Sequence, residues 1–162
     1  MKTYKEGSSG RKKKSQSPLR FEDMAKKINF YLKEENLNLN FKGYKEVVMR
    51  YFRLQDHDLY EIFQVMTECN LWSNYMSDVE NFIQAKTLDY QMEADRLNAY
   101  FDKKVPNEEL ELEIKKAKWK AKEFTIFQKQ VIAQKVFFEK SFWHCYKLYG
   151  KGINTMTYKT MD

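Results

Sequence analysis

Residues that break helices, form disulfides or bind metals are scarce in this chain. Its 162 residues include five Gly, two Pro, two Cys and two His. The shortage of Gly and Pro, together with few strand signals, predicts an all-α protein. No pair of cysteines has metal-binding spacing, and the sequence contains no Gly-rich phosphate loop and no nucleophile motif. We therefore expect a non-enzymatic protein that needs no cofactor and no metal.

Long hydrophobic runs are also missing. No apolar run approaches the about 18 residues that a transmembrane helix needs. The first residues, MKTYKEGSSGRKKK, are too polar for a signal peptide. We expect a cytoplasmic protein, in the host cytoplasm if a phage encodes it, with no membrane partner. Cys69 and Cys145 each lie within an apolar helical stripe, which predicts two buried thiols and no disulfide.

The positive charge is concentrated at the N-terminus. The chain has a formal net charge of +6, and residues 1–20 contain seven basic side chains but only one acid, Glu6. Residues 1–18 have almost no apolar side chains and are predicted to form a disordered basic tail, which would attract phosphates without reading sequence. The alternative is a tail that only keeps the protein soluble. The densest part of the tail is Arg11, Lys12, Lys13 and Lys14.

Two short amphipathic helices are predicted over residues 19–55. A Ser-Pro pair at residues 17–18 is a helix-start signal, with Ser as the cap and Pro at the first helical position. The first helix is expected to end near Asn36, and an Asn-rich loop separates it from the second. Asp56 or Asp58 can cap the helix that follows. The apolar stripes of the two short helices are Leu19, Phe21, Met24, Ile28, Tyr31 and Leu32, then Tyr44, Val47, Val48, Tyr51 and Phe52.

Two long helices are predicted to pack as an antiparallel coiled-coil hairpin over residues 56–152. Residues 58–102 contain no Gly or Pro, and their apolar positions alternate three and four apart, which is typical of a coiled-coil seam. A second long helix of near-equal length follows after a short break, so the two should fold back on each other. Pairing about residues 104 and 105 would bring two pairs together: Trp119 with Tyr90, and Phe138 with Leu71.

The ends of the second long helix carry their own signals. Pro106 and Asn107 can stop the first long helix and cap the second. Gly150 and Gly152 are expected to end the second helix, because glycine is the usual residue just past a helix C-terminus. Residues 153–162 would then form a C-terminal tail.

Residues 124–149 have apolar side chains on every side of the predicted helix. Fifteen of these 26 positions are apolar or aromatic. Such a helix must be covered on more than one side, and we expect the two short N-terminal helices to be too small to cover it. The sequence therefore predicts a homo-oligomer. The expected contact residues are Trp72, Phe127, Val131, Phe137, Phe138, Phe142 and Trp143.

One segment, KKAKWKAKE, places cations around a tryptophan. Proteins that bind single-stranded nucleic acid combine a cationic track for the phosphates with aromatic rings on which bases stack. The segment offers Trp119 with Lys115, Lys116, Lys118, Lys120 and Lys122. Further candidates near the predicted turn are Arg96, Tyr100, Lys103 and Lys104. Several acids flank the segment and lie opposite it in the hairpin, so a salt-bridged, solvated face accounts for the same lysines.

Scattered residues over about 72–152 resemble the UvsY family of phage recombination mediators. They are Trp72, Asn74, Ser77, Arg96, Leu97, Tyr100 and Phe101, followed by a Cys-bearing apolar helix that ends at Gly150. The resemblance implies that Arg96, before the aromatic pair, binds single-stranded DNA and that residues 124–149 assemble a ring. It also implies a recombinase and a single-strand-binding protein as partners. Asp95, the extra Ala99, the basic tail and the first two helices depart from the family pattern.

Two functions from different classes fit these observations. The first is a non-enzymatic, homo-oligomeric accessory protein of recombination or replication that binds single-stranded DNA or RNA. The second is a helical scaffold or interaction protein, such as a virion assembly part or an inhibitor of a host protein. In the second case the lysines would only be solvated.

Overall fold

A computed structural model describes residues 18–102 and 107–160, and every regular element within them is a helix. The elements are α1 (Pro18–Glu34), α2 (Phe41–Phe52), α3 (Leu59–Asp102) and α4 (Glu108–Thr160). The predicted all-α fold is therefore confirmed. The predicted basic tail lies outside the described residues.

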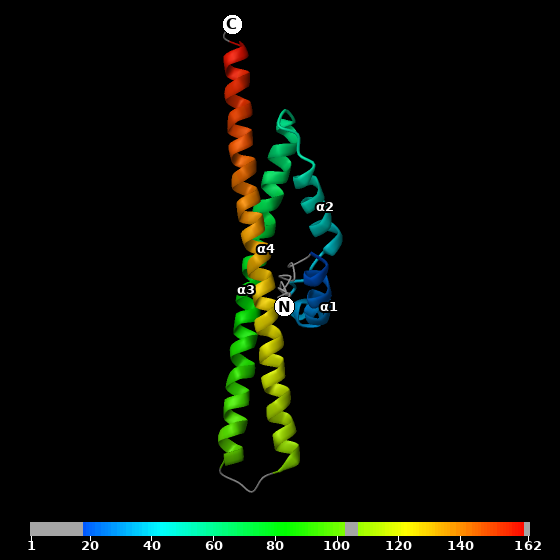
Figure 1. The fold of residues 1–162 in the computed structure, drawn as a ribbon, viewed down its shortest axis with the longest axis vertical. Helices are drawn as coiled ribbons and strands as arrows, with labels where there is room; N and C mark the ends of the chain where they lie inside the picture. Colours follow the sequence, from blue (N-terminus) through cyan, green and yellow to red (C-terminus); the bar gives the residue numbers. More distant parts are fainter. Residues whose placement is uncertain (1–17, 103–106, 161–162) are drawn as a thin grey trace, which may run out of the picture.

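The two long helices lie antiparallel, side by side, and form the predicted hairpin (Figure 1). Its register follows from two contacts across the pair. The Trp72 ring on α3 stacks on Phe138 of α4 at 5.8 Å between centroids, and Lys120 Nζ of α4 lies 5.4 Å from the ring centroid of Tyr90. Both contacts fit pairing about residue 105, close to the predicted 104 and 105. At 1.5 Å per residue, α3 is about 66 Å long.

Side-chain and backbone caps define most of the helix ends. The Asp58 carboxylate accepts a hydrogen bond from the Glu61 backbone N–H at 3.1 Å, and Asn107 Oδ1 accepts one from Glu109 at 2.9 Å. Both residues act as the caps that the sequence predicts. After α1 the chain reverses at Asn36, whose φ of 56° lies in the left-handed region that Asn tolerates.

The predicted end of α4 at Gly150 and Gly152 is wrong, because the helix continues without a break to Thr160. A glycine ends a helix when it takes a positive φ, and neither of these does so. Gly152 instead permits close packing, since a Cβ at this position would collide with the side chain of Leu59 at the start of α3. Beyond that contact, α4 projects past the first turn of α3 (Figure 1).

Helices α1 and α2 lie along the same side of the hairpin and cover its apolar half (Figure 1). The Phe21 ring of α1 is parallel to that of Phe127 on α4, with 6.0 Å between centroids. The Tyr44 ring of α2 packs edge-on against Phe138 at 5.8 Å. The apolar surface of residues 124–149 is thus covered by α3 on one side and by the short helices on another, within a single chain.

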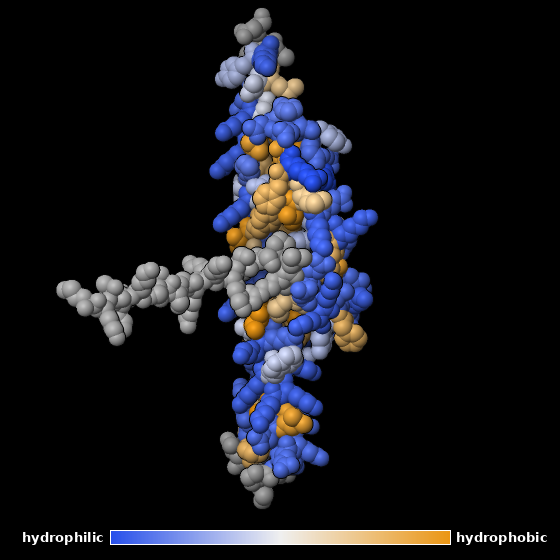
Figure 2. Space-filling view, turned by 45° about the vertical axis from the view of Figure 1, so that its right-hand side comes forward, coloured by the Kyte–Doolittle hydropathy of each residue, from blue (hydrophilic) through white to orange (hydrophobic). Residues whose placement is uncertain are grey.

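The turn end of the hairpin has a different composition. A small second core of Ala94, Leu97, Ile114 and Ala117 joins α3 and α4 there. Hydrophilic side chains dominate the surface of this end, whereas apolar ones gather higher up, near α1 and α2 (Figure 2). The hairpin therefore has a thick apolar half and a thin polar half.

Truncation of Phe138 tests the core. The ring is fully buried at 0 % exposure. We expect Phe138→Ala to lower the free energy of unfolding by about 3 to 5 kcal/mol, because it removes buried contacts and leaves a cavity. Urea unfolding followed by circular dichroism measures the change. The matched control, Phe30→Ala on α1, removes an exposed ring and should cost less than about 1 kcal/mol; equal losses in the two variants would contradict this core.

The cysteines provide a second test. Both are free and buried, and burial raises the pKa of the Cys69 thiol to about 12 and that of Cys145 to about 11. The thiolate is the reactive form, so Ellman's reagent should leave both thiols unmodified in the native protein at mildly alkaline pH. Both should react in concentrated guanidinium. Rapid labelling of two thiols without denaturant would show that the core opens readily.

Candidate nucleic-acid interface

The predicted lysine segment lies on α4 close to the turn. Ala117 and Ala121 are buried in the seam with α3, and the segment's tryptophan and lysines are all exposed. The Trp119 side chain is 64 % exposed. A large aromatic ring is thus held in water on a rigid helix, with Lys115, Lys116 and Lys122 within one turn of it. This arrangement offers a stacking surface with adjacent cations.

Some of the predicted cations already have partners in the chain. Lys115 Nζ lies 3.1 Å from a carboxylate oxygen of Glu111. Arg96 donates two hydrogen bonds to Glu93, at 2.8 and 2.9 Å, and this pairing lowers the pKa of Glu93 and raises that of Arg96. Lys120 lies over the Tyr90 ring. The salt-bridged interpretation therefore accounts for part of the surface.

Three lysines of the segment are left for an external anion. Lys116, Lys118 and Lys122 make no ion pair within residues 18–102 and 107–160. Lys118 and Lys122, with Lys129, line a groove of about 440 Å³ between α3 and α4. The α3 wall of the groove is Gln91, Ala94 and Asp95. Because the groove has three cations and one acid in its lining, its electrostatics favour an anion such as a phosphate.

The structure brings only part of the predicted binding surface together. Arg96 is not in the groove, and its guanidinium is occupied by Glu93. Tyr100 is exposed near the end of α3. Lys103, Lys104, and the tail cations Arg11, Lys12, Lys13 and Lys14 lie outside the described residues. Lys129 is a groove cation that the sequence prediction omitted, although its position seven residues after Lys122 gives it the same side of a coiled-coil helix.

The predicted assembly residues occupy different environments. Phe127, Val131 and Phe138 are fully buried within the single chain, and Trp72, Phe137 and Phe142 are partly buried against the same core. Trp143 is 57 % exposed. A second copy could contact Trp143 readily, but the three fully buried side chains are already used by the fold. The chain's own short helices cover more of α4 than the sequence predicts.

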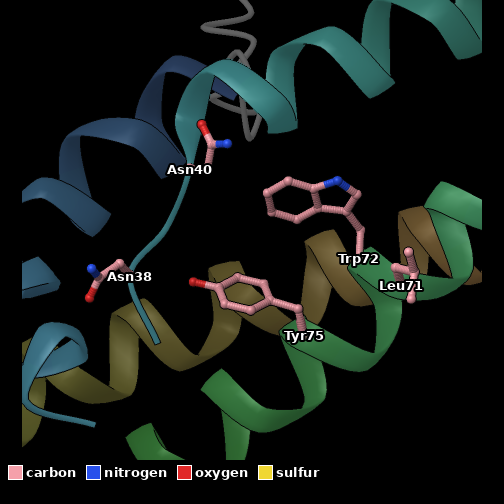
Figure 3. Close-up of a pocket in the computed structure, with 5 residues that line it drawn as sticks. All are labelled: Asn38, Asn40, Leu71, Trp72 and Tyr75. Carbon is pink, nitrogen blue, oxygen red and sulfur yellow. The ribbon is translucent and has the colours of Figure 1, made fainter. Parts of the chain in front are cut away.

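A second hollow lies beside the loop between α1 and α2 (Figure 3). It measures about 250 Å³ and is lined by Asn38, Asn40, Leu71, Trp72 and Tyr75. The Tyr75 hydroxyl donates a hydrogen bond to the Leu37 carbonyl at 2.7 Å, and burial raises its pKa. The lining offers no acid or base that could transfer a proton near neutral pH, so the hollow has no catalytic constellation.

Two other kinds of site are missing from the described part of the chain. Residues 18–102 and 107–160 contain no cluster of three or more His, Cys, Asp or Glu side chains that could hold a metal ion. None of the four helices is long and apolar enough to cross a membrane.

Comparison with protein-family models, curated proteins and solved structures finds no match to this chain. The resemblance to the UvsY family therefore stays a prediction from scattered residues. The interpretation of the α4 surface therefore depends on the exposure and charge of its own side chains.

Proposed function

We propose that this protein binds single-stranded nucleic acid, DNA or RNA, through Trp119 and its neighbouring lysines on α4, and that it acts as a non-enzymatic accessory protein. The observation that carries the proposal is the exposure of Trp119 beside Lys116, Lys118 and Lys122, which make no ion pair within the described residues. Salt bridges can explain surface lysines, but they do not explain an indole ring held in water. Stacking of a base on such a ring contributes about 1 to 3 kcal/mol.

The same geometry favours a single strand over a duplex. In a duplex the base faces are already stacked on each other, so a ring on a convex helix surface cannot reach them. The phosphates of either form can approach Lys116, Lys118 and Lys122. The basic residues Arg11, Lys12, Lys13 and Lys14 would add attraction that does not distinguish the two forms. Preference for the single strand should therefore come from Trp119.

A place in recombination or replication is the biological setting we propose for this binding. Its support is the resemblance of residues 72–152 to the mediators, with a recombinase and a single-strand-binding protein as the implied partners. Arg96 is held by Glu93, so we place the principal strand contact on α4. Assembly into a homo-oligomer is a separate prediction from the sequence, and light scattering of the full-length protein tests it.

An interaction protein is the second candidate, and the C-terminal end of α4 favours it. The helix projects past α3 (Figure 1), and Ile153 and Tyr158 there are exposed apolar side chains. Exposed apolar residues on a projecting helix suit a protein partner. If this is the main function, Ile153→Glu should abolish partner capture and the oligonucleotide assay below should show no binding.

Replacement of Trp119 tests the stacking contact. We expect Trp119→Ala to weaken binding of a labelled single-stranded oligonucleotide about 5- to 150-fold, the equivalent of about 1 to 3 kcal/mol for one stacked base. Trp119→Phe should retain most of the affinity, because it keeps an aromatic face. Fluorescence anisotropy with the full-length protein measures both variants. The control is Met92→Ala, which removes an exposed apolar side chain from α3 and should leave the affinity for the oligonucleotide unchanged.

Replacement of lysines tests the phosphate contacts. We expect the double variant Lys118→Gln, Lys122→Gln to reduce the slope of log affinity against log salt by about 1.4, at about 0.7 for each lost phosphate contact on a single strand. The triple variant Lys12→Gln, Lys13→Gln, Lys14→Gln should weaken single-strand and duplex binding by the same factor. If the tail variant alone loses all binding, and binding never favours the single strand, the α4 surface is not the site.

A further inference from the structure

The exposed side of α4 carries a cationic and aromatic surface that continues far beyond the lysine segment. In a coiled-coil helix, residues seven apart lie on the same side. Two neighbouring columns of this kind follow α4 from residue 115 to residue 147. One column is Lys115, Lys122, Lys129, Val136 and Trp143, and the other is Trp119, Ile126, Ala133, Lys140 and Lys147. We call these ten residues the α4 track.

All the charged residues of the α4 track are positive. It contains five lysines, two tryptophans and no acid. Apart from Ala133, which is partly buried, every member is exposed. Lys115 pairs with Glu111, whereas the other four lysines make no ion pair within the described residues. From residue 115 to residue 147, the positive charge of the track suits a polyanion.

The short helices leave the α4 track open. Helix α2 contacts the next column of α4, where Tyr51 packs on Phe137 and its hydroxyl lies 2.9 Å from His144 Nδ1. Trp143 lies on the other side of this contact and lines a groove of about 450 Å³. The groove offers amide and hydroxyl groups from α3 beside the indole ring. Its lining is Asn70, Ser73, Val136, Glu139, Lys140, Phe142 and Trp143.

The two tryptophans are separated by a distance that one strand can span. Trp119 and Trp143 are 24 residues apart on a continuous helix, which is about 36 Å at 1.5 Å per residue. At the about 3.4 Å per nucleotide of a stacked strand, this distance corresponds to about 11 nucleotides, and to fewer when the strand is extended. Lys122, Lys129 and Lys140 lie between the rings, where phosphates would pass.

We propose that a single strand of nucleic acid lies lengthwise along the α4 track, with one base on Trp119, another on Trp143 and the intervening phosphates beside the track lysines. The proposal rests on the proposed function and names the path of the strand. A single strand is the occupant that the surface fits, because it supplies both regularly spaced anions and free base faces. A second copy of the chain fits less well, since two tracks of lysines would repel each other.

The test compares two oligothymidines, of four and sixteen nucleotides, by anisotropy with the full-length protein. Only the longer one can reach both tryptophans. We expect Trp143→Ala to weaken binding of the sixteen-nucleotide strand at least about fivefold, as expected for one lost stacking contact, and to change the four-nucleotide strand less than about twofold. The double variant Lys140→Gln, Lys147→Gln should weaken the longer strand selectively. The control double variant Lys33→Gln, Lys42→Gln, on α1 and α2, should leave the affinity for both oligothymidines unchanged.

A second readout places the strand at Trp143 directly. In the Trp119→Phe variant, the remaining exposed tryptophan of the described residues is Trp143. Its fluorescence should be quenched by the sixteen-nucleotide strand if a base stacks on it. Circular dichroism and light scattering of each variant establish that fold and mass are unchanged.

The outcomes separate this inference from the proposed function. If the protein binds single strand and duplex equally and Trp119→Ala does not change the affinity, both the proposed function and the path of the strand are overturned. Binding that depends on Trp119 but is insensitive to Trp143, Lys140 and Lys147 would overturn the path alone. A lower mass of the Trp143→Ala protein would show that a second copy covers this ring. Trp143-dependent binding to vesicles of phosphatidylserine and phosphatidylcholine, without binding to oligothymidine, would identify an anionic membrane surface instead.

Discussion

The whole structure depends on how the apolar surface of α4 between residues 124 and 149 is covered. A helix that is apolar on several sides is unstable in water unless more than one element packs on it. Helix α3 covers one side through the hairpin seam, and α1 and α2 cover an adjacent side. Phe127 and Phe138 lie where these layers meet, and both are fully buried. This arrangement buries part of the apolar surface within one chain, while Trp143 and Tyr146 stay exposed, and it gives the protein a thick half and a thin half.

The thin half is a pair of packed helices, and three alanines, Ala94, Ala117 and Ala121, are among the buried residues of its seam. Ala117 and Ala121 are buried in this seam, whereas the longer side chains of the same turns are exposed. Lysines and Trp119 therefore lie on the surface because the seam excludes them. Intramolecular pairs occupy some of the charges, as between Lys115 and Glu111. The lysines that make no such pair within the described residues form the cationic part of the surface.

The length and continuity of α4 connect the two halves. A single helix from Glu108 to Thr160 holds Trp119 and Trp143 at a defined separation and on one side. A surface of this kind loses little conformational entropy when a ligand binds, because the backbone is already ordered. The aromatic rings and the charges are thus already arranged along the helix before a ligand binds. The functional interpretation follows from this preorganisation: a long ligand with repeating charges and flat rings matches the surface better than a compact one.

Local chemistry in the sequence was sufficient for the helices, their caps and the register of the hairpin. Asp58 and Asn107 cap because their side chains reach backbone N–H groups two or three residues ahead. The break signalled by Pro106 and Asn107 sets the residues about which the two long helices pair. Only the tertiary structure decided where α4 ends, because Gly152 packs against Leu59. It also decided which aromatic rings are buried. The sequence predicts contacts between copies of the chain for both Phe138 and Trp143. In the structure Phe138 packs against α2 and the core, whereas Trp143 faces water, since burial depends on segments distant in the chain.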